Sequence, residues 1–445
     1  MPASPEQRKQ LKNLYQRIAD KPLEPGSPYY EPIYGHAGCD DPVALMQKNI
    51  EFSDTESVQM FSGFRGSGKT TELFRLKESL QEQGYVVLYG DALKYLNPAQ
   101  EIDISDLLIV LAGTFSDALD AENLADIGRD SYWDRIVNYL TTTNVELDEI
   151  GLKSGAEFKL SLETVPTFRQ RLQEKMASRI GELKKTVDRF FEDGIKAIRA
   201  KRGDDIPGVV FIFDQMEQIR GSLANEQSVI HSVERLFSQH LKLMEIPYLH
   251  MVYTVPPWLK FMLPNMVRIE MLPSIRQWNN DPSRSQYPDG WKALRSLVFR
   301  RFGSQDFGQF FGASGSQHPL ADRLIAVCGG HFRDLLLLLR EAVLRVQSLP
   351  ISEDVIQSAI TAATSNFLPI AIDDAKWLTQ IEHVRGPVLP STGEKDVNRL
   401  TRFLDTHFVL YFANGTEWYD IHPLIRDEVA AIATRQAAKP PPAGA

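Results

Sequence analysis

The residues Gly63-Phe64-Arg65-Gly66-Ser67-Gly68-Lys69-Thr70 carry the strongest signal in the sequence. They match the pattern G-x-x-x-x-G-K-[ST] of a phosphate-binding loop, or P-loop, at every specified position. Its three glycines let the backbone turn tightly, so that main-chain N–H groups converge on phosphate oxygens. Lys69 places a positive charge on the outer phosphates, and Thr70 offers a hydroxyl ligand to Mg²⁺. The helix that begins here directs the positive end of its dipole at the same phosphates.

The sequence on either side fits this motif. Residues 57–62 read as a short strand, and residues 71–76 open a helix with Leu73, Leu76 and Leu80 at helical spacing. Strand, glycine-rich loop and helix in this order form the arrangement that a P-loop requires. A glycine-rich turn without a ligand is the alternative. We predict an α/β nucleotide-binding domain, with nucleotide contacts from Gly63, Arg65, Gly66, Ser67, Gly68, Lys69, Thr70 and Thr71.

The composition is that of a globular protein with an ordinary charge balance. The 445 residues are enough for about three domains, and 43% of them are hydrophobic and 24% charged. The net charge of −9 argues against a broad basic surface, although a local nucleic-acid patch stays open. Cys39 and Cys328 lie far apart in no ligand-like spacing, which indicates a reducing compartment and no zinc site.

No segment of the sequence indicates a membrane or a secretion route. Residues 1–12 are polar and lack a signal-peptide core. Apolar runs such as residues 107–112 and 335–339 are far shorter than the ~18 residues of a membrane span. We therefore expect a cytoplasmic protein without a membrane partner.

A second diagnostic stretch runs from Gly208 to Glu217. Its unbroken apolar part reads as a strand buried on both faces at the centre of a parallel sheet. Asp214 stands at the carboxyl end of this strand, where ligands bind in open α/β sheets. This Walker B pattern predicts that Asp214 and Thr70 hold Mg²⁺, and that Glu217 polarises the attacking water. The alternative is that Asp214 caps the next helix and Glu217 is exposed on it.

The remaining strands and insertions of this domain are less specific. Thr254, at the end of a strand beside the Walker B strand, is either a γ-phosphate sensor or an ordinary strand-end residue. Residues 145–162 contain a possible hairpin, and residues 167–202 read as one long helix with a solvated, mixed-charge face. Further strands are predicted at residues 85–89, 248–254 and 266–271.

From Asp289 onward the pattern is helical. The stretch Gly329-Gly330-His331-Phe332-Arg333 opens a leucine-rich helix, and Arg333 lies in its first turn. The helix dipole disfavours a cation there, so a nearby anion would justify it. We interpret Arg333 either as a nucleotide sensor or as the partner of Asp334 or another acid.

The C-terminal part ends with a predicted hairpin. Apolar and aromatic runs at residues 407–411 and 417–421 flank Asn414-Gly415, a strong two-residue turn signal. Helices precede the hairpin and another is expected at residues 423–431, which together suggest a winged helix.

We predict a P-loop NTPase parallel sheet with helices on both faces, followed by a helical lid and a winged-helix domain. An N-terminal arm before the core either covers the adenine or packs on the sheet. The predicted segments are the arm at residues 1–50, the P-loop core at 51–275 with a helical insertion at about 120–205, the lid at 276–350, the winged helix at 351–435 and a disordered tail at 436–445.

In this order the motifs resemble the STAND and Orc/Cdc6-like branch of the AAA+ NTPases. The resemblance covers residues ~50–430 in architecture, but only a few short motifs in sequence. The two acids of the Walker B stretch are similar to the NACHT and KAP groups, with Gln215 in place of their small residue and Glu217 in place of their usual Asp. The stretch 329–333 is similar to the sensor 2 segment of Orc/Cdc6-like proteins, and it lacks the Gly-x-Pro of many STAND members.

The resemblance also bears on the hairpin and on function. The stretch Asp420-Ile421-His422-Pro423-Leu424 is similar to the winged-helix motif whose histidine contacts bound ADP in STAND proteins. It implies that His422 locks a closed, ADP-bound state, the alternative being a packed histidine. It further implies a slow or partner-stimulated ATPase switch that uses ATP or ADP with Mg²⁺ and forms nucleotide-dependent homo-oligomers. Since no effector or sensor domain is recognisable, we expect a separate protein partner.

Two other functions are consistent with parts of the sequence. A DNA-loading ATPase of the Orc/Cdc6 or transposition type would place the winged helix on nucleic acid. A small-molecule kinase would use the P-loop for phosphoryl transfer, but it would leave the Walker B acids and the winged helix unexplained.

Overall fold

The computed structural model describes residues 5–35, 41–124, 132–142, 154–222, 224–263, 267–312, 317–391 and 394–437. By its internal contacts the chain divides into two compact units. Unit 1 comprises residues 1–42, 63–74 and 272–445, and unit 2 comprises residues 43–62 and 75–271. None of the described helices is both long and apolar enough to cross a lipid bilayer.

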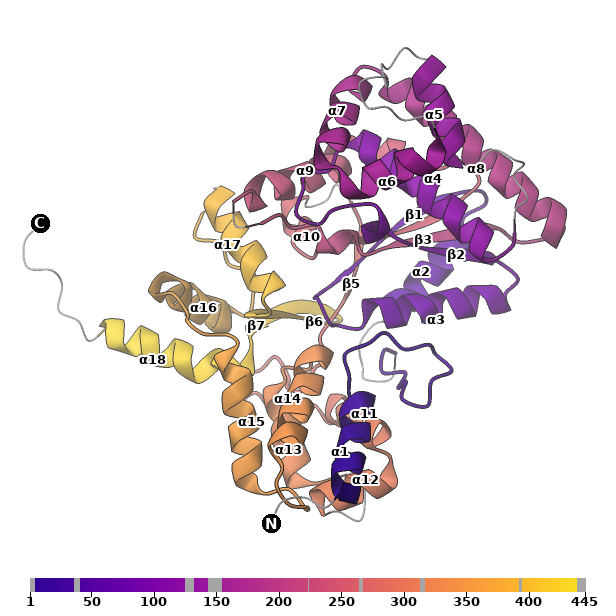
Figure 1. Cartoon of the computed structure of the whole chain (residues 1–445). Coiled ribbons are helices and arrows are strands. Elements are labelled where there is room, and N and C mark those ends of the chain that lie inside the picture. The colour runs from indigo at the N-terminus through magenta and orange to yellow at the C-terminus, as the bar shows by residue number, and fades with distance from the viewer. Residues whose placement is uncertain are drawn as a thin grey trace, which may run out of the picture. The chain divides into compact units, whose positions relative to one another are not determined.

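Unit 2 is built on a five-stranded sheet with the strand order β2-β3-β4-β1-β5 (Figure 1). The pairs β2–β3, β3–β4 and β4–β1 are parallel. All residues of β3 and β4 are buried, as expected for central strands of a parallel sheet. The α/β fold class is therefore confirmed. The strands are β1 (Ser57–Gly63), β2 (Val86–Asp91), β3 (Val209–Asp214), β4 (His250–Val255) and β5 (Ile269–Leu272).

Helices cover both faces of this sheet. In Figure 1, α2 and α3 lie on one side of the strands, and α4 lies on the other with α8 packed against it. Most of α4 is buried, and Phe115 on it contacts the rings of Phe191 and Phe211. The helices are α2 (Pro42–Glu51), α3 (Lys69–Glu82), α4 (Ile104–Ala121), α5 (Tyr132–Thr142), α6 (Gly155–Thr164), α7 (Pro166–Met176), α8 (Ile180–Arg202), α9 (Glu226–Gln239) and α10 (Leu259–Met262).

Two predictions for the insertion are wrong. The described part of the predicted hairpin at residues 145–162 is helix α6, which begins where the Ser154 hydroxyl accepts a hydrogen bond from Glu157 N; residues 143–153 lie outside the described part. The predicted single helix is two helices, α7 and α8, separated at residues 177–179. Buried Arg169 fixes α7 by donating to the main-chain oxygens of Tyr95 and Leu162, a tertiary constraint that helical periodicity does not reveal.

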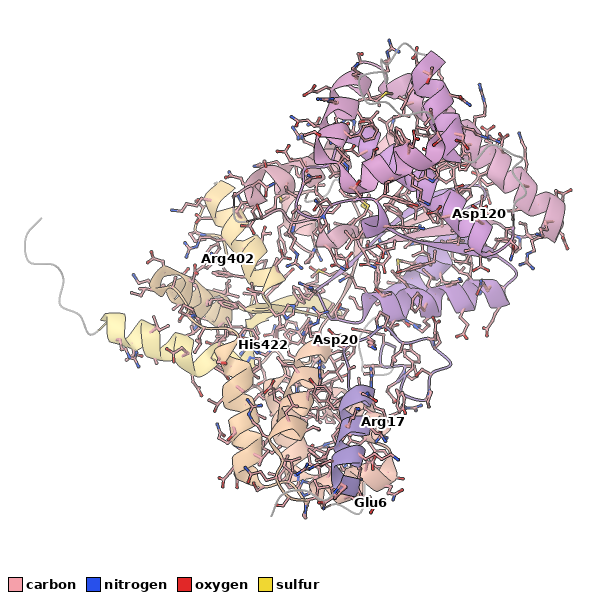
Figure 2. All side chains as sticks on the ribbon, viewed as in Figure 1. Glu6, Arg17, Asp20, Asp120, Arg402 and His422 are labelled. Atoms are coloured by element: carbon pink, nitrogen blue, oxygen red, sulfur yellow. The ribbon has the colours of Figure 1, made fainter. Side chains whose placement is uncertain are left out.

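Unit 1 is largely helical and ends with a hairpin. In it, α1 packs on α11 and α14 (Figure 1), and Arg17, labelled in Figure 2, pairs with Asp306 and donates to Phe302 O. The elements are α1 (Pro5–Arg17), α11 (Pro288–Phe302), α12 (Ser304–Phe311), α13 (Pro319–Val327), α14 (Phe332–Arg345), α15 (Glu353–Ser365), α16 (Ile372–Val384), α17 (Glu394–Asp405), β6 (Val409–Asn414), β7 (Thr416–Ile421) and α18 (Arg426–Ala437).

The predicted hairpin is confirmed. Strands β6 and β7 pair antiparallel around Gly415, whose φ of +80° is the left-handed conformation that an Asn-Gly turn requires. Helix α16 packs on α18 and β7, and α17 contacts β6. The order of helices, hairpin and closing helix is the predicted one, and the assignment as a winged helix stays a prediction. Helices α12 and α16 were not predicted, and most of the predicted tail lies outside the described residues.

Candidate functional site

The P-loop lies in unit 1, between the end of β1 and the start of α3. Lys69 is buried, and its Nζ donates to the main-chain oxygens of Gly63 and Phe64, each at 3.0 Å. Gly66 and Gly68 have φ angles of +87° and +93°, which disfavour any side chain. The loop thus has the tight turns that its glycines predict, with the lysine ammonium held inside it. Of the other predicted contacts, Ser67 is buried, Thr70 is half-buried and Arg65 is exposed.

The first turn of α14 packs on these two glycines. The main-chain N of Arg333 donates to Gly66 O at 3.2 Å. A Cβ atom on Gly66 would collide with Cβ of Arg333, and one on Gly68 would lie 3.3 Å from the ring of Phe332. Glycine is therefore required here for the approach of α14 as well as for the turns of the loop.

The N-terminal connector contacts the same loop. Tyr34 Oη donates to the main-chain oxygens of Pro273 at 3.1 Å and Ser67 at 3.3 Å, and its ring packs edge-on against Phe332. The main-chain N of Leu23 donates to Thr71 Oγ1 at 3.1 Å. The arm is thus anchored on the P-loop. Sequence reasoning did not single out Tyr34, because no local pattern marks it.

The side chain of Arg333 has an acidic partner. Its guanidinium pairs with Asp20, which Figure 2 labels, and both side chains are about one third exposed. An ion pair this exposed contributes at most ~1 kcal/mol, so an anion of higher charge can replace Asp20 at little cost. The predicted alternative of an acidic partner is met by Asp20. Asp334 is engaged elsewhere.

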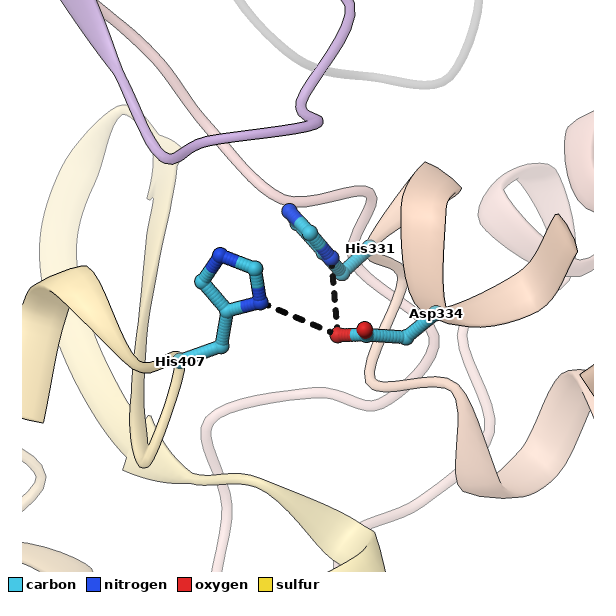
Figure 3. A group of neighbouring side chains, drawn as sticks. All are labelled: His331, Asp334 and His407. Atoms are coloured by element: carbon cyan, nitrogen blue, oxygen red, sulfur yellow. Dashed lines mark hydrogen bonds and ion pairs between the residues drawn. The ribbon is translucent and has the colours of Figure 1, made fainter. Parts of the chain in front are cut away.

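Asp334 is the centre of a buried histidine cluster. Its Oδ2 lies 2.8 Å from Nδ1 of His331, 3.2 Å from Nε2 of His422 and 3.3 Å from Nδ1 of His407. Figure 3 shows the first and last of these imidazoles directed at the carboxylate. All four residues are buried, with at most 7% of each residue exposed. Because His407 precedes β6 and His422 follows β7, the cluster joins the start of α14 to both strands of the hairpin.

His422 is a packed histidine in this arrangement. Its Nδ1 accepts a hydrogen bond from Leu424 N at 3.2 Å, its Nε2 faces Asp334, and its ring packs on Phe367. Nδ1 is therefore engaged within unit 1, and Nε2 lies beside the Asp334 carboxylate without a hydrogen bond. A contact of His422 with nucleotide requires another arrangement of the hairpin and stays a prediction.

Burial dominates the electrostatics of the cluster. Burial, and then the neighbouring His407, lower the pKa of His331. Burial alone would raise the pKa of Asp334, but the three imidazoles hold that pKa well below its usual range. The cluster at neutral pH therefore contains an ionised carboxylate and a neutral His331.

The lowered pKa of His331 predicts acid sensitivity. Below about pH 6.5 the unfolded chain protonates this histidine while the folded chain does not, so stability falls with pH by up to ~1.4 kcal/mol per pH unit. The depressed pKa of Asp334 acts in the same direction only below about pH 4. We expect a lower Tm at pH 5.5 than at pH 7.5, and a smaller difference in His331→Gln, measured with EDTA present.

The exposed His383 on α16 provides the control for this measurement. His383→Gln keeps the wild-type dependence of Tm on pH. The groups facing His331 are Asp334, His407 and Arg333. An unchanged dependence in His331→Gln would assign the acid sensitivity to other groups.

The Walker B acid lies in unit 2. Asp214 is fully buried at the end of β3, and both of its carboxylate oxygens accept hydrogen bonds, from Tyr89 Oη and from Gln215 N, each at 2.7 Å. Burial, and then this carboxylate, raise the pKa of Tyr89, which stays a donor. A short 3₁₀ turn over Met216–Gln218 follows, and no side chain caps it. The alternative role of Asp214 as a helix cap is therefore not observed.

Glu217 lies on this 3₁₀ turn and is 9% exposed. The alternative of an exposed position on a helix is therefore not observed. Thr254 Oγ1 accepts a hydrogen bond from Met216 N at 3.2 Å. Gln215 has a φ of +74°, unusual for a non-glycine residue, and its side chain donates to Asp91 Oδ2 at 2.7 Å. Thr254 and Gln215 thus position the turn that carries Glu217.

Tyr89 and Asp91 were missed from the sequence. Asp91 is paired in register with Asp214 across strands β2 and β3. The rule that parallel strands end at the same edge could have found Asp91, because it ends the predicted second strand. For Tyr89 there was no such signal.

Comparison with known proteins yields solved structures only. No protein-family model and no curated protein matches the sequence. The chain is similar to the Aeropyrum pernix ORC2 protein in its ADPNP–ADP complexes, at 12% identity and a TM-score of 0.40, over 95% of this chain and 98% of that chain. For the ADP form the identity is 13% and the TM-score 0.42, over 95% of this chain and 98% of that chain. For a Walker-type ATPase of Pyrococcus abyssi the identity is 10% and the TM-score 0.39, over 88% of this chain and 94% of that chain. Scores at this level carry no argument about activity or partners.

Proposed function

We propose that this chain is an ATP-binding and ATP-hydrolysing regulatory switch. The observation that carries the proposal is the contact of the first turn of α14 with Gly66 and Gly68 of the P-loop. The same turn carries Asp334, which is bound to histidines on both sides of the β6–β7 hairpin. A ligand at the P-loop would therefore act on an element that is tied to the C-terminal part of unit 1.

The roles proposed for the site residues follow from their chemistry. The P-loop N–H groups and Lys69 bind the phosphates of ATP or ADP. The hydroxyl of Thr70 and the carboxylate of Asp214 are hard oxygen donors of the kind that Mg²⁺ prefers, and they would hold this ion, which neutralises phosphate charge. Glu217 polarises the attacking water, and Thr254, Gln215 and Tyr89 position the two acids.

Arg333 is proposed as the residue that distinguishes nucleotide states. A phosphate carries more charge than the Asp20 carboxylate, which is about one third exposed, so it competes for the guanidinium. A ligand shifts a conformational equilibrium only by its differential affinity for the two states. ATP and ADP differ at the γ-phosphate. Arg333 would contact this phosphate in ATP and would have no such contact with ADP. The expected outcome is a change in assembly or in binding of a separate protein partner.

The experiment measures bound nucleotide, turnover and mass on one batch. We expect denatured wild-type protein to release nearly one ADP per chain, to show slow turnover, and to change its light-scattering mass between ADP and a non-hydrolysable ATP analogue. Arg333→Ala is expected to abolish the difference in mass. Arg323→Ala, which removes another half-exposed ion pair of unit 1, keeps it. A wild-type mass that is the same with every nucleotide would contradict the switch.

A DNA-loading ATPase is the second candidate. It is favoured by the β6–β7 hairpin between α17 and α18, the order of elements in a winged helix. It predicts DNA binding whose affinity falls steeply with salt concentration, measured by fluorescence anisotropy. Absence of binding at low salt with each nucleotide would exclude it.

A further inference from the structure

The imidazoles of the Asp334 cluster, on His331, His407 and His422, each have a buried Nε2 without a hydrogen-bond partner among the residues that the structure describes. Two of these rings, those of His331 and His407, share an orientation. In both rings the other nitrogen, Nδ1, is directed at Oδ2 of Asp334 (Figure 3). A neutral imidazole that donates from Nδ1 has a lone pair on Nε2. The cluster therefore holds two buried lone pairs.

The two rings are close enough to share one ion. Their centroids are 4.0 Å apart and their planes are inclined by 52°. In Figure 3 both Nε2 atoms are at the ends of the rings that point away from Asp334. Two nitrogens bound tetrahedrally to one ion at about 2.0–2.1 Å are separated by about 3.3 Å. Both rings would turn about their side-chain bonds to bring the two Nε2 atoms to this separation around one ion.

We propose that His331 and His407 bind a divalent transition-metal ion of the Zn²⁺ type through their Nε2 atoms, with Asp334 as the carboxylate that orients both rings. A metal-binding histidine usually donates its second ring N–H to a carboxylate or carbonyl, which fixes its tautomer. Asp334 does this for both histidines with one oxygen atom. Imidazole nitrogens select ions such as Zn²⁺, Ni²⁺ or Co²⁺ over Mg²⁺, which prefers oxygen.

His422 supports the carboxylate and is not a ligand. Its Nδ1 accepts a hydrogen bond from Leu424 N, so the proton of the neutral ring is on Nε2. That nitrogen lies 3.2 Å from Oδ2 of Asp334, at ion-pair distance but without a hydrogen bond to it. A metal bound at Nε2 would displace this proton to Nδ1, where it would face the N–H of Leu424.

A cation also compensates the charge of the cluster. Among the residues that the structure describes, Asp334 forms ion pairs with His331, His407 and His422. A buried carboxylate without a cation is costly, and a divalent ion on the two imidazoles supplies positive charge through them. Cysteine spacing argued against zinc in the sequence, but these ligands are histidines from segments far apart in the chain.

The test uses the full-length protein, stripped with EDTA, desalted and supplied with Zn²⁺ or Co²⁺ without nucleotide. We expect about one ion per chain after a second desalting, measured by mass spectrometry of the metal, and a visible Co²⁺ absorption band typical of nitrogen ligation. His331→Gln and His407→Gln are expected to bind at least 100-fold more weakly. Asp334→Asn, which keeps both ligands, is expected to lose 10- to 100-fold. His383→Gln, an exposed histidine, matches wild type.

Two results would overturn the site. One is a natively folded wild-type protein, judged by circular dichroism, that retains no more Zn²⁺ or Co²⁺ than a chelator-treated sample. The other is wild-type metal content in both ligand variants. If a variant fails to fold, the Co²⁺ spectrum of the wild type still reports whether imidazoles bind the ion. Binding of phosphate instead of metal at the cluster of the folded protein would show that the histidines are protonated, because a protonated imidazole has no lone pair for a metal. That result too would overturn the proposal.

Discussion

Replacing Lys69 with alanine is expected to raise the Kd for both ATP and ADP at least 100-fold, a loss of about 2.7 kcal/mol. The ammonium is buried, and it donates to two main-chain oxygens of the loop, so it is held where phosphate charge would be placed. Charge-assisted hydrogen bonds of this kind are about twice as strong as neutral ones. Isothermal titration with ATP and ADP, after removal of bound nucleotide, measures the effect directly.

Lys77 provides the matched control. It lies on the same helix α3 and forms an exposed ion pair with Glu122, so Lys77→Ala removes the same charge outside the P-loop. We expect it to bind nucleotide as the wild type does. Wild-type affinity in a folded Lys69→Ala protein would show that the P-loop is a structural turn, which is the alternative that the sequence left open.

The parts of the fold that the sequence predicted are those with local rules. The P-loop, the β3 strand that ends at Asp214 and the Asn-Gly hairpin each depend on residues close together in the chain. Glycine φ angles, unbroken apolar runs and turn preferences are sufficient to specify such elements. The structure confirms the tight turns of the loop, the buried strand and the hairpin.

The insertion was predicted poorly because its helices are set by tertiary contacts. Helical spacing continues from α7 into α8, and nothing in the spacing marks the break at residues 177–179. Helix α7 is anchored by Arg169 and by Gln173, which donates to the buried carboxylate of Asp106. Such partners are more than 60 residues away or belong to another helix, so local pattern cannot identify them.

In the candidate site, too, local features were predicted and long-range partners were not. Sequence reasoning found Arg333 with His331 and Asp334 beside it, and it interpreted Arg333 as a nucleotide sensor or as the partner of Asp334 or another acid. The observed partner, Asp20, is 313 positions away. His407 was read only as part of a strand, because its meeting with Asp334 depends on how the hairpin packs on α14. The sequence indicates which chemistry each residue can perform, whereas the partner of each residue is determined by the fold.

Glu217→Gln is expected to lower the ATP turnover rate by about 10²- to 10⁴-fold while leaving the Kd for ATP within a few-fold of wild type. Glutamine keeps the volume of the side chain in the 3₁₀ turn, but its amide cannot accept a proton from the attacking water. Single-turnover hydrolysis measured beside a titration separates the two effects. Glu245→Gln, at an exposed position, is the control and hydrolyses ATP at the wild-type rate.

Loss of turnover in Glu217→Gln would not come from unfolding. Burial raises the pKa of the neighbouring Asp91, and the charge of Glu217 raises it further, so these acids repel one another. Removing one of the charges relieves that repulsion, and we expect a Tm equal to or above that of the wild type. A variant with raised or unchanged Tm, intact ATP binding and lost hydrolysis would assign Glu217 to the chemical step. Full turnover in the same variant would leave the acid a structural member of the turn and require another group to activate the water.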